Sequence, residues 1–410
     1  MKNSNNSILK IIPYSICVLL VLISCQSRDQ ELAHISTPSK EGGEPNLHIS
    51  SDGTPLLSWI EYDEDMVSLV FSRWKDDQWS IPKEIAKGNN WFVNWADFPS
   101  LVTYKNNPNH LAAHWLEKSA EGTYDYDVRV SQSKDGGNSW SESFVLHTDG
   151  IAAEHGFVSF LPLDEGRTFA TWLDGRNTKN DTLVNSNHGH GGSMTLRAAE
   201  FDIDGNLYHE DEIDDRVCEC CQTSAAMTDR GPIVVYRDRS ENEIRDIYVS
   251  RREDGKWTTP HAVYHDNWHI QGCPVNGPSI VTNGRMVAVA WFSMAENKPE
   301  VKVAFSSDNG NNFDSPFTID GGDPLGRVDM LYSNNDVVLV SWLEQTEDGA
   351  EIVLGKVHMK DGLLEKKTLV STDNSRQSGF PRMELKGNEL FIAWTAADSI
   401  TAVKTGILKI

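Results

Sequence analysis

The feature of this sequence that most constrains its fold is a pattern that recurs seven times along the chain. Each copy contains a short apolar run that ends near an aromatic residue, followed by a polar loop and a second run of alternating polarity. Successive aromatic residues lie 51 to 64 residues apart. They are Trp59, Trp115, Trp172, Tyr236, Trp291, Trp342 and Trp394. A period of this length is typical of repeat architectures.

The runs within each copy have the periodicity of β-strands. Second runs such as VSLVFSR at 67–73 and RDIYVSR at 245–251 alternate in polarity and are rich in Val, Ile, Phe and Tyr. A short strand precedes each aromatic run, as in FPSLVTY at 98–104, and we find no long helical period. Four strands in each unit, repeated around an axis, predict an all-β fold, a β-propeller of four-stranded blades. Seven blades are favoured, and six are the alternative if the first or last unit is irregular.

The last repeat lacks a fourth strand, which leaves its blade incomplete. The segment ELAHIST at 31–37, near the other end of the chain, has the length and composition to supply that strand. We therefore expect the N-terminal segment to complete the last blade and close the ring, because closure removes exposed sheet edges.

The first 25 residues have the pattern of an export signal. Lys2 and Lys10 precede an apolar stretch that is too short to span a bilayer. The end of the signal, Leu22-Ile-Ser-Cys25, resembles the lipobox of bacterial lipoproteins, so Cys25 is the expected site of lipidation. The alternative is an ordinary signal peptide with a chance cysteine. In either case the mature chain is expected outside the cytoplasm, where disulfides are allowed.

These features divide the chain into three predicted parts. Residues 1–25 are the lipoprotein signal peptide, 26–45 a polar tether and 46–410 the propeller. We expect a periplasmic or outer-membrane lipoprotein of a bacterial cell envelope, which contacts the membrane only through its lipid anchor. The net charge of −23 argues against nucleic acid or an anionic membrane surface as the main partner. We expect a monomer.

Two of the repeats carry the string S-x-D-x-G-x-x-[WF] after their second run. Its residues are Ser133, Asp135, Gly137, Trp140, Ser306, Asp308, Gly310 and Phe313. This string and the blade period, which extends over the whole mature chain, resemble the Asp-box or BNR repeats of the sialidase (neuraminidase) superfamily. In such a turn the Ser and Asp side chains bind the backbone, Gly adopts a positive φ and the aromatic ring packs beneath.

The resemblance implies a propeller that acts on or binds extracellular glycans, at best as an exo-sialidase-like glycoside hydrolase. Sialidases of this fold bind the substrate carboxylate with three arginines and use an Asp as general acid and a Tyr–Glu pair as nucleophile. Their R-I-P motif is absent here, and the nearest string is Gly379-Phe-Pro-Arg382. Turnover therefore stays open, and a non-catalytic propeller that binds a glycan or a protein is the alternative.

The repeat register places one set of loops around the mouth of the central channel, where a small acidic sugar is the expected ligand. These are the loops before each first strand and those after each second strand. The candidate general acids there are Asp174, Asp238 and Asp246. The candidate substrate-binding residues are Arg176, Arg237, Arg239, Arg245, Arg327, Arg382, Trp91, Trp95 and His155. Arginine forks suit a carboxylate. The alternatives are an ion-pair network between blades for the charged groups and caps on the core for the tryptophans.

Four cysteines of the mature chain form the last candidate group. Aligning Ser224 with Ser279 places Cys218 and Cys273 at equivalent positions, so Cys218, Cys220, Cys221 and Cys273 should cluster at the mouth. Two disulfides are one interpretation, in which Cys220 or Cys221 pairs with Cys273, because a bond between adjacent cysteines is strained. A zinc or copper site that also uses His188 and His190 is a second, and a reactive thiol a third. No cofactor is expected under the first interpretation.

Overall fold

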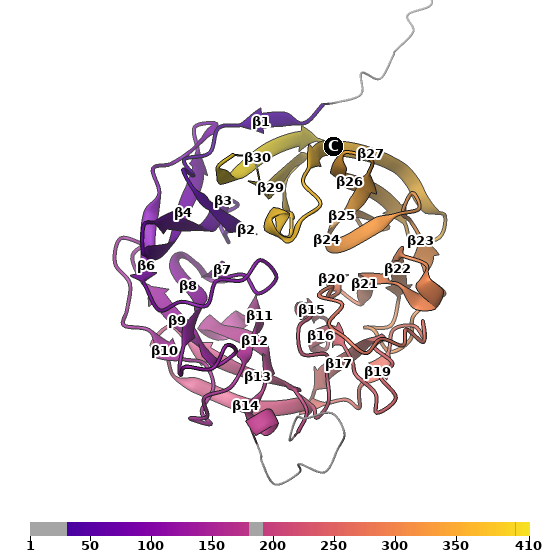
Figure 1. The fold of residues 1–410 in the computed structure, drawn as a ribbon, viewed down its shortest axis with the longest axis horizontal. Helices are drawn as coiled ribbons and strands as arrows, with labels where there is room; N and C mark the ends of the chain where they lie inside the picture. Colours follow the sequence, from indigo (N-terminus) through magenta and orange to yellow (C-terminus); the bar gives the residue numbers. More distant parts are fainter. Residues whose placement is uncertain (1–30, 180–191, 398) are drawn as a thin grey trace, which may run out of the picture. The chain divides into compact units, whose positions relative to one another are not determined.

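The computed structural model describes residues 31–179, 192–397 and 399–410. Seven antiparallel sheets are arranged around a central axis, and the first strand of each sheet lies nearest to it (Figure 1). The sequence-based prediction of an all-β propeller with seven blades is confirmed. The segment from Glu31 to Ile410 forms one compact unit.

Each of the first three blades is formed by consecutive strands of the chain. The strands of blade 1 are β2 (Gly42–Ile49), β3 (Pro55–Asp63), β4 (Met66–Lys75), β5 (Gln78–Trp79) and β6 (Lys83–Gly88). The strands of blade 2 are β7 (Ser100–Tyr104), β8 (Asn107–Lys118), β9 (Tyr126–Ser133) and β10 (Phe144–Val145). The strands of blade 3 are β11 (His155–Pro162), β12 (Arg167–Asp174), β13 (Thr195–Asp202) and β14 (Leu207–Asp214).

The next three blades follow the same plan. The strands of blade 4 are β15 (Ser224–Thr228), β16 (Gly231–Arg237), β17 (Ile247–Glu253), β18 (Lys256–Trp257) and β19 (His261–Ala262). The strands of blade 5 are β20 (Ser279–Asn283), β21 (Met286–Ser293), β22 (Glu300–Ser306) and β23 (Phe317–Thr318). The strands of blade 6 are β24 (Pro324–Asn334), β25 (Val337–Thr346), β26 (Gly349–His358) and β27 (Gly362–Thr372).

Blade 7 is assembled from both ends of the described chain. Three of its strands are β28 (Arg382–Lys386), β29 (Glu389–Ala397) and β30 (Thr401–Lys409), and the fourth is β1 (Ala33–Ile35), which pairs antiparallel with β30. The expected closure by the segment at 31–37 is therefore present (Figure 1). Strand β1 and the start of β2 lie inside the 26–45 segment that was expected to be a tether, so the propeller begins before residue 46.

The core lies between neighbouring blades. The aromatic residues that mark the repeats, such as Trp59, Trp172, Trp291 and Trp342, are fully buried. Trp291 of blade 5, for example, shares one apolar cluster with Ile233 of blade 4. Burying such a ring removes a large apolar surface from water, which explains why each repeat keeps an aromatic residue here.

The two Asp-box turns bind their own backbone. In blade 2, Asp135 Oδ1 accepts hydrogen bonds from the backbone N–H of Asn138 and Ser139 at 3.0 and 2.9 Å, and Ser133 Oγ accepts one from Gly137 N–H at 2.8 Å. Gly137 has φ of 79°, and a Cβ atom there would lie 2.3 Å from Phe71. Only glycine fits this turn, which lies at the end of the blade opposite the loops that carry the candidate site.

Helical structure among the described residues is confined to short 3-10 turns. They are η1 (Asp164–Gly166), η2 (Arg176–Lys179), η4 (Ala295–Asn297) and η5 (Arg376–Ser378). Within the described ranges, no helix is long and apolar enough to cross a membrane.

Candidate functional site

A cavity of about 300 Å³ lies along the axis of the propeller. All seven first strands contribute to its wall, and Asp97, Phe98 and Phe380 from the loops before β7 and β28 also line it. Asp97 and Arg382 are charged groups that reach this cavity from different blades. The loops predicted to form the mouth therefore border an internal space of polar character.

Three acidic or phenolic groups form a hydrogen-bonded trio that includes Asp97 on the cavity wall. The hydroxyl of Tyr126, at the start of β9, lies 3.1 Å from Asp97 Oδ2 and 3.0 Å from Glu154 Oε1. Asp97 Oδ1 also accepts a hydrogen bond of 2.7 Å from Phe157 N–H. Close packing requires glycine at position 156, because a Cβ atom there would lie 2.0 Å from Asp97 Oδ2.

The trio holds more protons than three isolated groups would at neutral pH. Tyr126 has one hydroxyl proton and can donate it to only one of the two carboxyl groups. The other carboxyl group can hydrogen-bond to the Tyr126 oxygen only when it carries a proton of its own. Burial raises the pKa of Asp97 to about 7. Burial also raises the pKa of Glu154 to about 7, and the charge of Asp97 adds to that effect. Asp97, which lines the cavity, is buried, whereas Glu154 is partly exposed.

A second network begins at His155, the first residue of β11. Its ring stacks on His147 at 3.6 Å between centroids, and Asp149 lies 2.6 Å from His147 Nδ1 and 3.2 Å from His155 Nε2. Asp174 Oδ1 lies 3.6 Å from His155 Nε2. Arg176 binds Asp174 through two hydrogen bonds of 2.8 and 2.7 Å. His155, Asp174 and Arg176, which the sequence placed at the mouth, therefore lie together.

Asp174 differs from the trio in its protonation. Burial favours its neutral acid, but the hydrogen bonds from Arg176 and the positive charges of His155 and Arg176 outweigh burial and hold its pKa below the ordinary value. Asp174 is therefore a carboxylate at neutral pH. In this state it holds Arg176 and His155 in place and has no proton to give to a leaving group.

The other two aspartates predicted as general acids lie in blade 4. Asp246 is buried and accepts backbone hydrogen bonds of 3.1 Å from both Asn267 and Trp268. Asp238 borders a separate open hollow of about 480 Å³ near Tyr248. Burial, followed by the charge of Asp214, raises the pKa of Asp238 to about 7. The three predicted aspartates thus belong to different local networks.

Four of the predicted arginines lie in blades 4 and 6, and two of these are used by the fold itself. Arg237 is buried, and its guanidinium donates to the backbone carbonyls of Asn276, Arg245 and Phe292 at 2.7–3.0 Å. Arg327 donates to Ser378 Oγ at 2.7 Å and to backbone carbonyls of the loop before β28. Arg239 and Arg245, in contrast, pair with acidic side chains.

Arg382 is the predicted arginine with the most unused binding capacity. It lines the central cavity, its side chain is 29% exposed, and its nearest acidic partner, Asp329, is 3.6 Å away. Within the described part of the chain, its Nε has no hydrogen-bond partner. An arginine with free donors beside a cavity suits an anionic ligand group.

The two tryptophans of the loop before β7 have different surroundings. Trp91 stacks on Trp115 at 5.3 Å between centroids. Trp95 stacks on Phe380 at 5.8 Å, and the guanidinium of Arg327 lies 4.9 Å from its ring. Trp95 therefore lies next to the residues that line the cavity, whereas Trp91 packs against blade 2.

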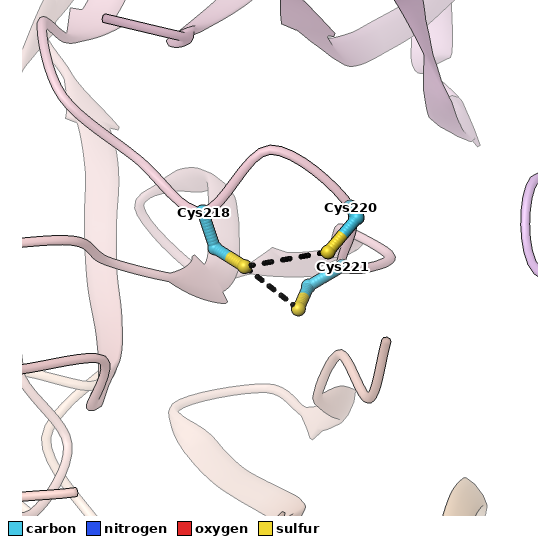
Figure 2. Close-up of side chains that lie close together, drawn as sticks. All are labelled: Cys218, Cys220 and Cys221. Carbon is cyan, nitrogen blue, oxygen red and sulfur yellow. Dashed lines mark hydrogen bonds between the residues drawn. The ribbon is translucent and has the colours of Figure 1, made fainter. Parts of the chain in front are cut away.

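The four cysteines cluster as the repeat register predicted. Cys220 and Cys273 form a disulfide with a Cα–Cα distance of 6.0 Å, and Cys273 was one of the partners expected for Cys220. Cys218 and Cys221 are free, buried thiols whose sulfur atoms are 3.0 Å apart (Figure 2). Two disulfides were one of the expectations, and the structure contains one of them, Cys220–Cys273. The predicted metal ligands His188 and His190 and the lipidation site Cys25 lie outside the described residues.

Tyr126, His147 and Asp149 are site residues that were not predicted from the sequence. Tyr126 is the first residue of a strand that was recognised only by its alternating pattern. Its place at the mouth end of β9, directly after the loop between the second and third strands, is the signal that could have identified it. Asp97 and Glu154 lie in loops before first strands, which the repeat register placed at the mouth, but neither was among the candidate residues.

Comparison with known proteins decides the family. The profile of the BNR repeat-like domain matches residues 62–359. The chain belongs to the BNR repeat-like domain family. No curated protein matches this BNR repeat-like chain by sequence. The propeller fold is that of sialidase-like BNR proteins, which confirms the resemblance seen in the sequence.

Three of the solved structures that are similar to this BNR repeat-like protein are a polysaccharide lyase, an arabinofuranosidase and a sialidase. The polysaccharide lyase Uly1 is similar with a TM-score of 0.54 at 9% identity, over 95% of this chain and 94% of that chain. The α-L-arabinofuranosidase Arb93A from Fusarium graminearum has a TM-score of 0.50 at 13% identity, over 93% and 96%. The NanB sialidase from Streptococcus pneumoniae has a TM-score of 0.48 at 9% identity, over 87% and 83%. At these identities the likeness concerns the fold alone.

Proposed function

We propose that this protein is an exported enzyme that cleaves an acidic glycan at the mouth of its propeller, with Glu154 as the general acid. The observation that carries the proposal is the hydrogen-bonded trio of Asp97, Tyr126 and Glu154. A partly exposed carboxyl group with a pKa of about 7 still holds its proton where most carboxyl groups have lost theirs. Such a group can donate a proton to the oxygen that leaves when a glycosidic bond breaks.

The other members of the trio would support Glu154 without contacting the sugar. Tyr126 holds the Glu154 carboxyl group in one orientation, and the buried Asp97 raises the pKa of Glu154 through its charge. Burial, followed by the charges of the two carboxyl groups, holds the pKa of Tyr126 well above the ordinary value, so Tyr126 stays a neutral hydrogen-bond donor. In the sialidases that the chain resembles, a Tyr–Glu pair serves as the nucleophile, so the role proposed here for Glu154 differs from the role of that pair.

Arg382 would select for an acidic sugar. Arg382 and Asp97 line the same central cavity, and the Arg382 side chain is 29% exposed. A sugar carboxylate bound by Arg382 would thus lie in the cavity that Asp97, one member of the trio, also lines. The known activities of similarly folded enzymes on polysaccharides and arabinosides make a glycan the natural substrate class for this proposal.

A second candidate function is binding without turnover. It is favoured by the observation that Asp174 and Asp246, together with Arg237 and Arg327, are held by ion pairs or backbone groups. Because these charged groups are held in fixed positions, the mouth is rigid, which suits a receptor that binds a glycan chain.

The two candidates differ in turnover. We would assay the wild-type protein on fluorogenic glycosides, including sialosides, and on uronic-acid polysaccharides, and repeat the assay with Glu154→Gln. The control is Glu365→Gln, which changes an exposed glutamate of the outer strand β27. Turnover that falls at least about 100-fold in Glu154→Gln alone supports the enzyme, because general acids contribute about 10²–10⁴-fold. Binding of an acidic glycan without turnover supports the second candidate.

The location of the protein belongs to the same proposal. The export signal and lipobox at the N-terminus are those of a lipoprotein anchored through Cys25. The Cys220–Cys273 disulfide supports this proposal, because disulfides persist mainly in oxidising compartments. A glycan of the cell surface or its surroundings would be accessible there.

A further inference from the structure

Four sulfur atoms at the mouth lie within reach of one another. Cys218 Sγ is 3.0 Å from Cys221 Sγ and 4.0 Å from Cys220 Sγ, and Cys220 is bonded to Cys273. Figure 2 shows the sulfur of Cys218 directed toward those of both Cys220 and Cys221. A dithiol and a disulfide therefore share one cluster, with Cys218 between them.

The exposure of these cysteines changes across the cluster. Cys218 and Cys221 are buried, Cys220 is partly exposed, and Cys273 is exposed. The cluster thus connects a thiol pair that solvent does not reach with a sulfur that meets solvent.

The surroundings of Cys218 favour its thiolate. Arg245 Nη1 lies 3.3 Å from Cys218 Sγ, and the same guanidinium is fixed by Glu219 at 2.8 Å and Glu243 at 3.0 Å. Burial opposes ionisation, but the hydrogen bond from the Cys221 thiol and the charge of Arg245 outweigh it and lower the pKa of Cys218. Arg237 adds positive charge from β16, while Glu154, in the loop before β11, adds negative charge.

The same geometry argues against a metal ion as the resident of this cluster. Cys220 is already bonded to Cys273, so its sulfur is not a thiolate ligand. The guanidinium of Arg245 occupies one side of Cys218 and would repel a cation there. These contacts favour nucleophilic chemistry of Cys218.

We propose that the four cysteines form a thiol–disulfide exchange site in which Cys218 is the nucleophile. The Cys218 thiolate attacks Sγ of Cys220, so that a Cys218–Cys220 bond forms and the Cys220–Cys273 bond breaks. The electron pair leaves on Cys273, which takes up a proton from solvent. Cys221 then gives up its proton and attacks Cys218, and Cys220 leaves as a thiolate that is protonated in turn.

The net change is an exchange of partners without an external oxidant. A buried dithiol and an outer disulfide become a buried Cys218–Cys221 disulfide and an outer dithiol at Cys220 and Cys273. The spacing of Cys218 and Cys221 is C-x-x-C, in which two cysteines readily form a disulfide. In the exchanged form, the exposed Cys273 thiol is the atom at which a disulfide of another protein would react. This activity is separate from the proposed glycan cleavage.

The exchange is tested by trapping its intermediate in the full chain. In Cys221→Ser, the second step is blocked, so the Cys218–Cys220 bond persists and Cys273 becomes a free thiol. A negatively charged maleimide added to the native protein should then label Cys273, as read by peptide mass spectrometry. The matched control is Cys218→Ser, which removes the nucleophile, and Cys221 cannot replace it because a bond between adjacent cysteines is strained.

We expect Cys273 to be labelled at least about tenfold faster in Cys221→Ser than in Cys218→Ser. Arg245→Gln should shift the pH profile of labelling to higher pH, which a merely structural role of Arg245 would not do. Equal labelling in the two cysteine variants would overturn the proposal, and so would one equivalent of a soft metal bound to the isolated protein.

A second measurement decides the matter if Cys221→Ser does not fold. The wild-type protein would be held at pH 8, quenched with acid and mapped for its disulfides. A Cys218–Cys221 pair alongside Cys220–Cys273 supports exchange, whereas Cys220–Cys273 alone after prolonged incubation overturns it.

Discussion

At the scale of single residues, the mouth contains carboxyl groups of opposite character. Asp97 and Glu154 are raised to a pKa of about 7, chiefly by burial. Asp149 and Asp174 are also partly or fully buried, but hydrogen bonds and charges from histidines or Arg176 lower their pKa values. The difference arises because Asp149 and Asp174 lie beside cationic side chains, whereas Asp97 and Glu154 share a phenol. Asp97 and Glu154 thus supply a proton, and Asp149 and Asp174 supply fixed negative charge.

Asp97 makes stability depend on pH in a predictable direction. Its pKa is about 4 in the unfolded chain and about 7 in the folded protein, so the folded state binds more protons between these values. The stability that Asp97 contributes by binding this proton is complete below pH 4 and is lost as pH rises through 7. Between these values, the free energy of unfolding falls by about 1.4 kcal/mol per pH unit. We expect the melting temperature to fall from pH 5 to pH 8.

The variant Asp97→Asn should flatten that fall, since asparagine has no proton to lose and can still accept from Phe157 N–H. Thermal unfolding followed by circular dichroism at several pH values measures this. Asp308→Asn, in an Asp-box turn, is the control, because the pKa of Asp308 is lowered and not raised. A wild-type melting temperature that rises steadily over this range would contradict the assignment.

Arg237 and Arg382 should respond differently to substitution. Arg237→Gln leaves buried carbonyl groups without their donors and should lower the free energy of unfolding by about 3 kcal/mol or more. Arg382→Gln removes a partly exposed group with few partners and should keep the fold. It should weaken binding of an acidic glycan at least about tenfold. Denaturant unfolding and calorimetric binding measure the two effects, and an equal loss of stability in both variants would refute this division of roles.

At the scale of elements, the ring depends on a three-residue strand. Strand β1 pairs with β30 and completes blade 7, and Thr37 Oγ1 adds a hydrogen bond of 2.6 Å to the carbonyl of Val403. Without β1, the outer edge of β30 would be exposed to other chains. The loop before β28 connects blade 7 to blade 6. Strand β1 pairs with blade 7 and is followed by β2, so it links the last blade to the first.

Truncation should reveal the role of β1. A chain that begins at residue 40 lacks β1 and should melt about 10 °C or more below a chain that begins at residue 31, or aggregate through the free edge. Melting temperature and light scattering measure these outcomes. Equal melting temperatures of the two chains would show that the closing strand adds no stability.

The sequence predicted the elements well and the side-chain contacts less well, for a physical reason. A repeat period with an aromatic residue in each second strand determines which strands pair, and register between repeats brought Cys220 close to Cys273. Contacts within the mouth depend on side-chain direction, which a pattern does not encode. Arg237 looked like an anion-binding residue, but its guanidinium is satisfied by three carbonyl groups. Tyr126 matched a strand pattern, and its hydroxyl proved to join two carboxyl groups.

At the scale of the whole molecule, the signal pattern and lipobox at the N-terminus predict a lipoprotein anchored through Cys25. We predict that Cys25→Ser abolishes incorporation of a labelled fatty acid and moves the protein from the membrane fraction to the soluble fraction. Cys17→Ser, in the apolar stretch of the signal, is the matched control and should keep both properties. Fatty-acid incorporation at the wild-type level in Cys25→Ser would disprove the lipobox assignment.

The central claim is that the propeller mouth cleaves an acidic glycan with Glu154 as the proton donor. It is tested most directly by the pH dependence of turnover on the best substrate of the glycan panel. We expect kcat to fall as pH rises through about 7 in the wild-type protein, and to be at least about 100-fold lower in Glu154→Gln. Turnover that is unchanged in Glu154→Gln, or absent on every acidic glycan, would contradict it.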